Sequence, residues 1–105
     1  MPAPKKKSMQ PRKVVVISRA KDSSWARIHY GALVEHDAVN GTATLDTARQ
    51  CLFYSRETGG EVGLAAIGPQ DGSRLSPMAP GLLHVSGVGT VQDASPAAQA
   101  KWEAS

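Results

Sequence analysis

The chain has 105 residues, a net charge of +3 and a single cysteine, and only 5% of its residues are aromatic. That is the length of one domain, too small for a deep cavity together with a substrate cleft, and 10 glycines with 7 prolines indicate many turns. One cysteine excludes an internal disulfide, and no apolar run approaches the roughly 20 residues that cross a bilayer. Because no hydrophobic segment follows the charged start, we expect no secretory signal, no membrane partner, and synthesis in the cytoplasm.

The basic residues are concentrated at the N-terminus. The first 13 residues contain no acid, whereas the rest of the chain has 7 basic residues against 9 acids. Residues 1–12 also contain almost no large apolar side chain, which predicts a flexible, extended arm before a single β-rich domain at residues 13–105. We interpret five basic residues as the partner-binding arm: Lys5, Lys6, Lys7, Arg12 and Lys13.

Three roles for this arm remain open. The lysines would neutralise nucleic-acid phosphates in a salt-sensitive manner, or they would lie along a neighbouring protein surface, or the arm would serve only as a solubilising tail. Aromatic residues between the lysines would favour stacking on single-stranded bases, and the arm contains none. Any nucleic-acid contact is therefore expected to be weak and sequence-independent.

Two strands are predicted in the first third of the chain. The β-branched run at residues 14–17 is apolar on both faces, which indicates an interior strand. From Ala26 to Val34 every second residue is apolar, which predicts a half-buried strand with one mostly solvated face. Gly31 within that strand indicates a bulge or a close approach of another backbone segment.

A hairpin follows. Asn40 and Gly41 predict a tight type I′ turn, because both residue types tolerate positive φ. A strand is expected at residues 42–45, a polar interruption at residues 46–50, and an aromatic strand at residues 51–54.

The second half of the chain predicts shorter elements. They are a short helix at residues 61–67, a brief edge strand at 74–75, and one bent strand or two short ones at 82–92. A terminal helix is expected at residues 96–103, with Ser95 as its N-cap and Pro96 at its first position. The fold class is therefore mainly β: a small antiparallel sandwich or partly open barrel with a short C-terminal helix and an extended basic N-terminal arm.

The residues that could carry chemistry form no recognisable motif. His29, His36, His84 and Cys51 lack the close spacing of metal ligands, so no metal site is predicted. Ser86 lies outside a nucleophile-elbow pattern, and Cys51 begins an apolar strand, where a buried, inert thiol is expected. We predict no catalytic residue, no cofactor and no enzymatic activity.

Two tryptophans are candidates for interface anchors, Trp25 in a polar loop and Trp102 near the C-terminus. Tryptophan is enriched at the centres of interfaces. The alternative is that each closes the edge of a small core that has few other aromatic residues.

Several short segments spread over most of residues 14–100 resemble a family of small proteins of unknown function from tailed bacteriophages. The segments are Ser18-Arg19 at the end of the first strand, Gly31-Ala32-Leu33-Val34, Leu45-x-x-Ala48-Arg49, Arg74-Leu75-Ser76 and Ser95-x-x-Ala98. Members of that family usually have aspartate where this chain has Thr47, and tryptophan where it has Leu52 and Tyr54. A binding surface formed by those tryptophans would be diminished here, and the resemblance implies a viral origin without a defined activity.

Together these features predict a non-enzymatic bacteriophage virion accessory protein, such as a decoration, cement or tail-associated subunit. Its partners would be other virion proteins or copies of itself, and it would be found in the virion and, during synthesis, in the host cytoplasm. Two alternatives are a cytosolic anti-defence or host-takeover binding protein, and a nucleic-acid-binding accessory protein that uses the basic arm.

Overall fold

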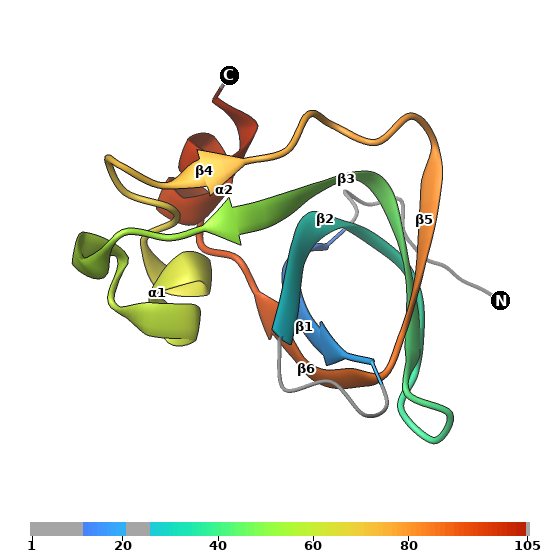
Figure 1. Cartoon of the computed structure of the whole chain (residues 1–105). Coiled ribbons are helices and arrows are strands. Elements are labelled where there is room, and N and C mark those ends of the chain that lie inside the picture. The colour runs from blue at the N-terminus through green and yellow to red at the C-terminus, as the bar shows by residue number, and fades with distance from the viewer. Residues whose placement is uncertain (1–11, 21–25, 105) are drawn as a thin grey trace, which may run out of the picture.

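Six strands form one antiparallel sheet in the computed structural model, which describes residues 12–20 and 26–104 (Figure 1). The strand order is β4-β3-β2-β1-β6, and β5 pairs with β3 along the same edge as β4. The elements are β1 (Lys13–Arg19), β2 (Ala26–Asp37), β3 (Thr42–Phe53), the 3-10 helix η2 (Arg56–Thr58), α1 (Gly60–Ala66), β4 (Arg74–Leu75), β5 (Leu82–Ser86), β6 (Val88–Asp93) and α2 (Pro96–Glu103).

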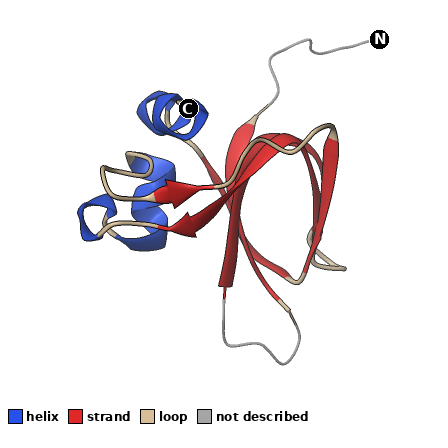
Figure 2. Cartoon of the chain, turned by 45° about the horizontal axis from the view of Figure 1, so that its top comes forward, coloured by secondary structure: helices blue, strands red, loops and turns tan. Residues whose placement is uncertain are grey.

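The sheet curls into a partly open barrel. Strands β1, β2, β3, β5 and β6 surround a shared interior, and both α-helices lie outside it on one side (Figures 1 and 2). No ladder joins β5 to β6 within the described ranges, so the sheet is not closed. The predicted mainly β class with a short C-terminal helix is confirmed, and a single curved sheet corresponds to the partly open barrel rather than to a sandwich.

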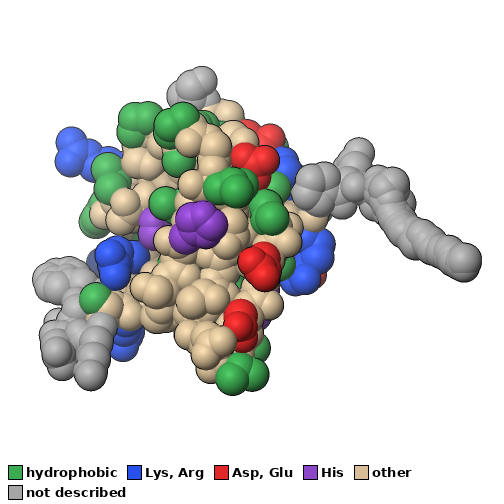
Figure 3. All heavy atoms as spheres, turned by 90° about the vertical axis from the view of Figure 1, so that its right-hand side faces the viewer, with side chains coloured by type: hydrophobic (Ala, Val, Ile, Leu, Met, Phe, Trp, Pro, Cys, Tyr) green, Lys and Arg blue, Asp and Glu red, His purple; other side chains and the backbone are tan. Residues whose placement is uncertain are grey.

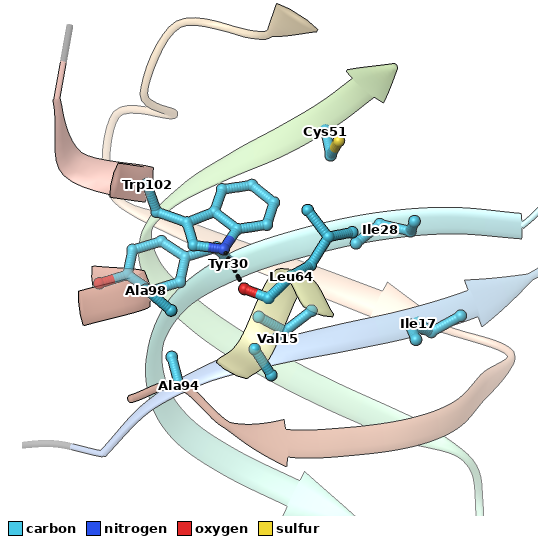
Figure 4. Packing of buried hydrophobic residues seen from close by; sticks show 10 residues of the cluster. Val15, Ile17, Ile28, Tyr30, Cys51, Leu64, Ala94, Ala98 and Trp102 are labelled. Atoms are coloured by element: carbon cyan, nitrogen blue, oxygen red, sulfur yellow. Dashed lines mark hydrogen bonds between the residues drawn. The ribbon is translucent and has the colours of Figure 1, made fainter. Parts of the chain in front are cut away.

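Strand β1 lies at the centre of the core. Residues 14–18 are all buried, which confirms the predicted interior strand. Because successive side chains of a strand point to opposite faces, Val15 and Ile17 pack on the helix side, while Val14 and Val16 pack inside the barrel. The cluster on the helix side comprises Val15, Ile17, Ile28, Tyr30, Cys51, Leu64, Ala65, Ala94, Ala98 and Trp102 (Figure 4).

The middle of the β2 face that was predicted to be solvated instead lines the barrel interior, while Arg27 and Glu35 at its two ends are exposed. Gly31 is buried and Leu33 packs against the inner cluster. Val34, expected on the buried face, is 57% exposed. The prediction was wrong because the curl of the sheet encloses that face, and because the ladder between β2 and β3 shifts register twice along the strand.

The turn between β2 and β3 is not the predicted type I′ turn. Strand β2 ends at Asp37 and β3 begins after Gly41, so residues 38–41 form a four-residue loop. The Asp37 carboxylate accepts the backbone N–H groups of Val39 and Asn40, both at 3.1 Å. Only Gly41 in the loop has a positive φ, of 67°. The aspartate side chain bonds the turn backbone directly, so a second left-handed residue is not needed.

Strand β3 continues through residues 46–50, where a polar interruption was predicted. The ladder passes this region by a bulge, in which Thr47 and Ala48 lie opposite Gly31. A Cβ atom at Gly31 would lie 3.1 Å from the Cα of Ala48, which confirms the predicted close approach. Thr47 has a φ of 53°, a conformation that is unfavourable for a β-branched residue.

Thr47→Gly is expected to raise the free energy of unfolding by about 0.5–1 kcal/mol. Relief of the left-handed strain exceeds the entropic cost of glycine, and the Thr47 side chain is exposed. Urea unfolding measures the effect. Thr42→Gly in the same strand is the matched control, because Thr42 has no positive φ, and it should lower stability by about 0.5–1 kcal/mol. Equal losses at the two positions would contradict the assignment of strain to Thr47.

Helix α2 occupies residues 96–103, as predicted. The Ser95 hydroxyl accepts the N–H of Ala98 at 3.0 Å, which confirms the N-cap. At the other end Arg49 of β3 donates from Nη1 to the carbonyl oxygens of Trp102 and Ala104, at 2.9 and 2.8 Å. A cation at a helix C-terminus also interacts favourably with the helix dipole. Ser95 therefore fixes the start of α2, and Arg49 fixes its end.

Helix α1 begins at Gly60, one residue before the predicted start, and ends at Ala66. The brief strand at residues 74–75 is confirmed, and residues 82–92 form two strands that are separated by a bend at Gly87. Neither described α-helix is long and apolar enough to cross a membrane.

Candidate functional site

The base of the predicted arm is paired with acids of the same chain. Arg12 donates from Nε and Nη2 to Asp93 Oδ1, at 2.9 and 2.7 Å, and Lys13 Nζ lies 2.7 Å from Glu103 Oε2. The Arg12–Asp93 pair is well exposed, so it contributes little to stability. The remaining arm residues, Lys5, Lys6 and Lys7, lie outside the described residues, as does Trp25.

Lys13, Glu103 and Tyr30 form a polar cluster where β1, β2 and α2 meet. The Tyr30 hydroxyl donates to the same Glu103 oxygen that accepts from Lys13. These two hydrogen bonds hold the pKa of Glu103 below its ordinary value. Burial and the hydrogen bond to Glu103 raise the pKa of Tyr30. With the carboxylate held ionised and the phenol held protonated, the cluster fixes the helix to the sheet and is poorly placed to exchange protons near neutral pH.

Glu103→Gln is expected to make the free energy of unfolding less sensitive to acidic pH. The pKa of Glu103 is lower in the folded state, so its ionised carboxylate stabilises the fold at pH values above the unfolded-state pKa of 4.5. This stabilisation is lost as the pH falls through the folded-state pKa. Urea unfolding at pH 7 and at pH 3 should show a smaller loss for this variant than for the wild-type chain. Glu57→Gln, at an exposed position of η2, is the control. A variant that loses as much stability as wild type would contradict the role of Glu103.

Trp102 lies in the core. Its side chain is fully buried, stacks on Tyr30 with 5.2 Å between ring centroids, and donates from Nε1 to the carbonyl oxygen of Leu64 at 2.9 Å (Figure 4). Trp102 therefore closes the core, which is one of the two alternatives for this residue. Its buried ring is not available on the surface as an interface anchor. Cys51 is buried in the same cluster, and burial raises its pKa to about 11, as expected of an inert thiol.

The fold brings together two histidines that are far apart in the sequence. His29 of β2 and His84 of β5 line one hollow of about 200 Å³, together with Ser18, Arg27 and Gln50 and the neighbouring residues of β5 (Leu83, Val85 and Ser86). We call this the polar hollow. Histidine side chains lie near the centre of the face that Figure 3 shows. No group of three or more potential metal ligands occurs in the part of the chain that the structure describes.

The opening of the barrel is a second candidate site. Strands β5 and β6 diverge from Gly87, and each has one edge without a strand partner among the described residues. Two backbone hydrogen bonds hold the end of the opening at Gly87: Arg19 N–H donates to the Gly87 oxygen at 2.9 Å, and Val88 N–H donates to the Gly41 oxygen at 2.9 Å. The sequence predicted a partly open barrel as one of two architectures, but it did not predict that β5 and β6 border the opening, because strand pairing is not encoded in local patterns.

Comparison of the chain with protein-family models, with curated protein sequences and with solved structures gave no match. The resemblance to the bacteriophage family therefore stays a prediction.

Proposed function

We propose that this chain is a non-enzymatic accessory subunit of a bacteriophage particle, for example a decoration, cement or tail-associated protein. It would act through contacts with other particle proteins or with copies of itself. The observation that best supports this proposal is the open sheet, with its two unpartnered strand edges at β5 and β6.

Neither edge carries the lysine or proline side chains that commonly block pairing. Natural edge strands are commonly blunted by lysine, proline or an inward-pointing charge. Strand β6 has neither lysine nor proline, and its only charged residue is Asp93 at its last position. Strand β5 contains His84 as its only ionisable residue. An extended segment of a partner can add to such an edge through main-chain hydrogen bonds.

Exposed apolar side chains offer a further contact area. Leu52, Phe53 and Val62 are 60%, 57% and 66% exposed, at the end of β3 and on α1. Leu52 is also one of the positions at which the resembling bacteriophage proteins have tryptophan, so the same part of the fold would carry the contact in those proteins.

Mass spectrometry of purified particles tests the proposal. The chain is expected as a stoichiometric component, and its absence from particles would overturn the proposal. Thr90→Lys introduces a charge at the exposed edge of β6 and is expected to reduce incorporation. Ala100→Lys, which adds the same charge at an exposed position of α2, should be incorporated like wild type.

A second candidate is a cytosolic protein that binds a host protein or a small nucleotide. The polar hollow favours it, because it offers several polar groups to a small ligand. A chain that is abundant in infected cells, missing from particles, and recovered with a host component would establish this function instead of the first.

A further inference from the structure

The polar hollow contains hydrogen-bonding groups that the described part of the fold leaves unsatisfied. Ser18 is 2% exposed, and its Oγ atom is shielded from solvent without a hydrogen-bond partner. The Nδ1 atom of His29 is shielded and unpartnered in the same way. Buried polar groups are nearly always hydrogen-bonded, and leaving one unpaired costs about 1–3 kcal/mol. Both residues line the polar hollow, so a ligand bound there is a candidate partner for these two groups.

A second, smaller hollow of about 140 Å³ adjoins the first. It shares His29, Gln50 and Leu83 with the polar hollow and adds Arg49 to the lining. The Nε atom of Arg49 is also shielded and has no partner in the described ranges, although its Nη1 atom is engaged at the end of α2. The two hollows therefore share one wall, which is formed by His29, Gln50 and Leu83.

The charges around this space favour an anion. Arg27 lines the polar hollow and Arg49 lines its neighbour, and no aspartate or glutamate lines either one. The Nδ1 atom of His84 lies 3.0 Å from Thr44 Oγ1, which leaves its other ring nitrogen available. Burial and the nearby Arg27 lower the pKa of His29, as expected of an imidazole beside a cation that has no anion to offset it.

We propose that the polar hollow binds a small oxyanion, such as a phosphate or carboxylate group. The Ser18 hydroxyl and the Arg27 guanidinium would donate hydrogen bonds to its oxygen atoms, and the His29 ring would donate a third from Nδ1. Hydrogen bonds to an ionised acceptor are stronger than those between neutral groups. A metal ion is disfavoured, because the lining offers no carboxylate oxygen. The inference is independent of the proposed particle function.

The test is a nuclear magnetic resonance titration of the full chain that follows the ring signals of His29. Sodium phosphate and sodium acetate are added in separate series, with sodium chloride keeping the ionic strength constant. A saturable shift with either oxyanion, absent with chloride alone, is the expected result. A stronger response to phosphate would indicate a phosphorylated ligand, and a stronger response to acetate would indicate a carboxylate ligand.

Two variants test the assignment of the donors. Ser18→Ala and Arg27→Gln should each weaken binding about tenfold, while Arg56→Gln, an exposed change in η2, should bind like wild type. Ser18→Ala removes an unsatisfied group, so it should fold at least as stably as wild type, and urea unfolding verifies this. The proposal is overturned if neither oxyanion gives a saturable shift, or if both variants bind as tightly as the wild-type chain.

Discussion

Trp102→Ala is expected to lower the free energy of unfolding by about 3–5 kcal/mol, the range for truncating a large buried aromatic side chain. The ring is fully buried, and it lies parallel to Tyr30 within 8°. Its loss would open a cavity between α1, α2 and the sheet, and it would leave the Leu64 carbonyl without its Nε1 partner. A small domain has only about 5–15 kcal/mol of stability in total, so this variant should be marginally folded.

Urea unfolding followed by far-ultraviolet circular dichroism measures this loss without relying on tryptophan fluorescence. Trp102→Phe separates the two contributions, because it retains most of the packing and removes only the hydrogen bond; a loss of about 1–3 kcal/mol is expected. Val62→Ala, at a position 66% exposed on α1, should change stability by less than about 0.5 kcal/mol. A Trp102→Ala variant as stable as Val62→Ala would mean that Trp102 does not belong to the core.

Gly87→Ala is expected to cost at least about 3 kcal/mol, because two penalties coincide at the bend between β5 and β6. Gly87 has a φ of 70°, and a left-handed conformation costs a residue with a Cβ atom about 1–2 kcal/mol. That Cβ atom would also lie 2.0 Å from the carbonyl oxygen of Arg19. Relieving the collision would pull apart the backbone hydrogen bond from Arg19 to Gly87, which holds one end of the barrel opening.

Gly81→Ala is the matched control for this variant. Gly81 has a φ of 82°, and a Cβ atom there would meet nothing within 4 Å. Its replacement should cost only the conformational penalty of about 1–2 kcal/mol. The difference between the two variants in urea unfolding measures the close approach of Arg19. Equal losses would show that Gly87 is required for its backbone conformation alone.

Local sequence patterns predicted the elements of this fold well where one residue type dominates. The run at residues 14–17 is apolar at every position, so it can lie only in the interior of a sheet. Ser95 followed by Pro96 defines the start of α2 through a single hydrogen bond. Such signals depend only on neighbouring residues, so they hold regardless of how the rest of the chain folds.

Predictions failed where long-range pairing decides the outcome. The alternation in β2 correctly placed Ile28 and Tyr30 on one buried face, but it could not show that the curl of the sheet would enclose the other face. Similarly, the polar residues 46–50 suggested a break, whereas pairing with Gly31 accommodates them in a bulge. The polar hollow was missed for the same reason, because Ser18, His29 and His84 come together only through the sheet.

We propose that the chain works by presenting the open edges of its sheet to partner proteins. Hydrogen–deuterium exchange of the backbone amides, measured for the isolated chain and for the chain within purified particles, tests this claim most directly. The amides of residues 82–93 should exchange more slowly in particles, while those of α2 keep their rates, since its hydrogen bonds are internal. Unchanged exchange at β5 and β6 in particles that contain the chain would contradict the claim.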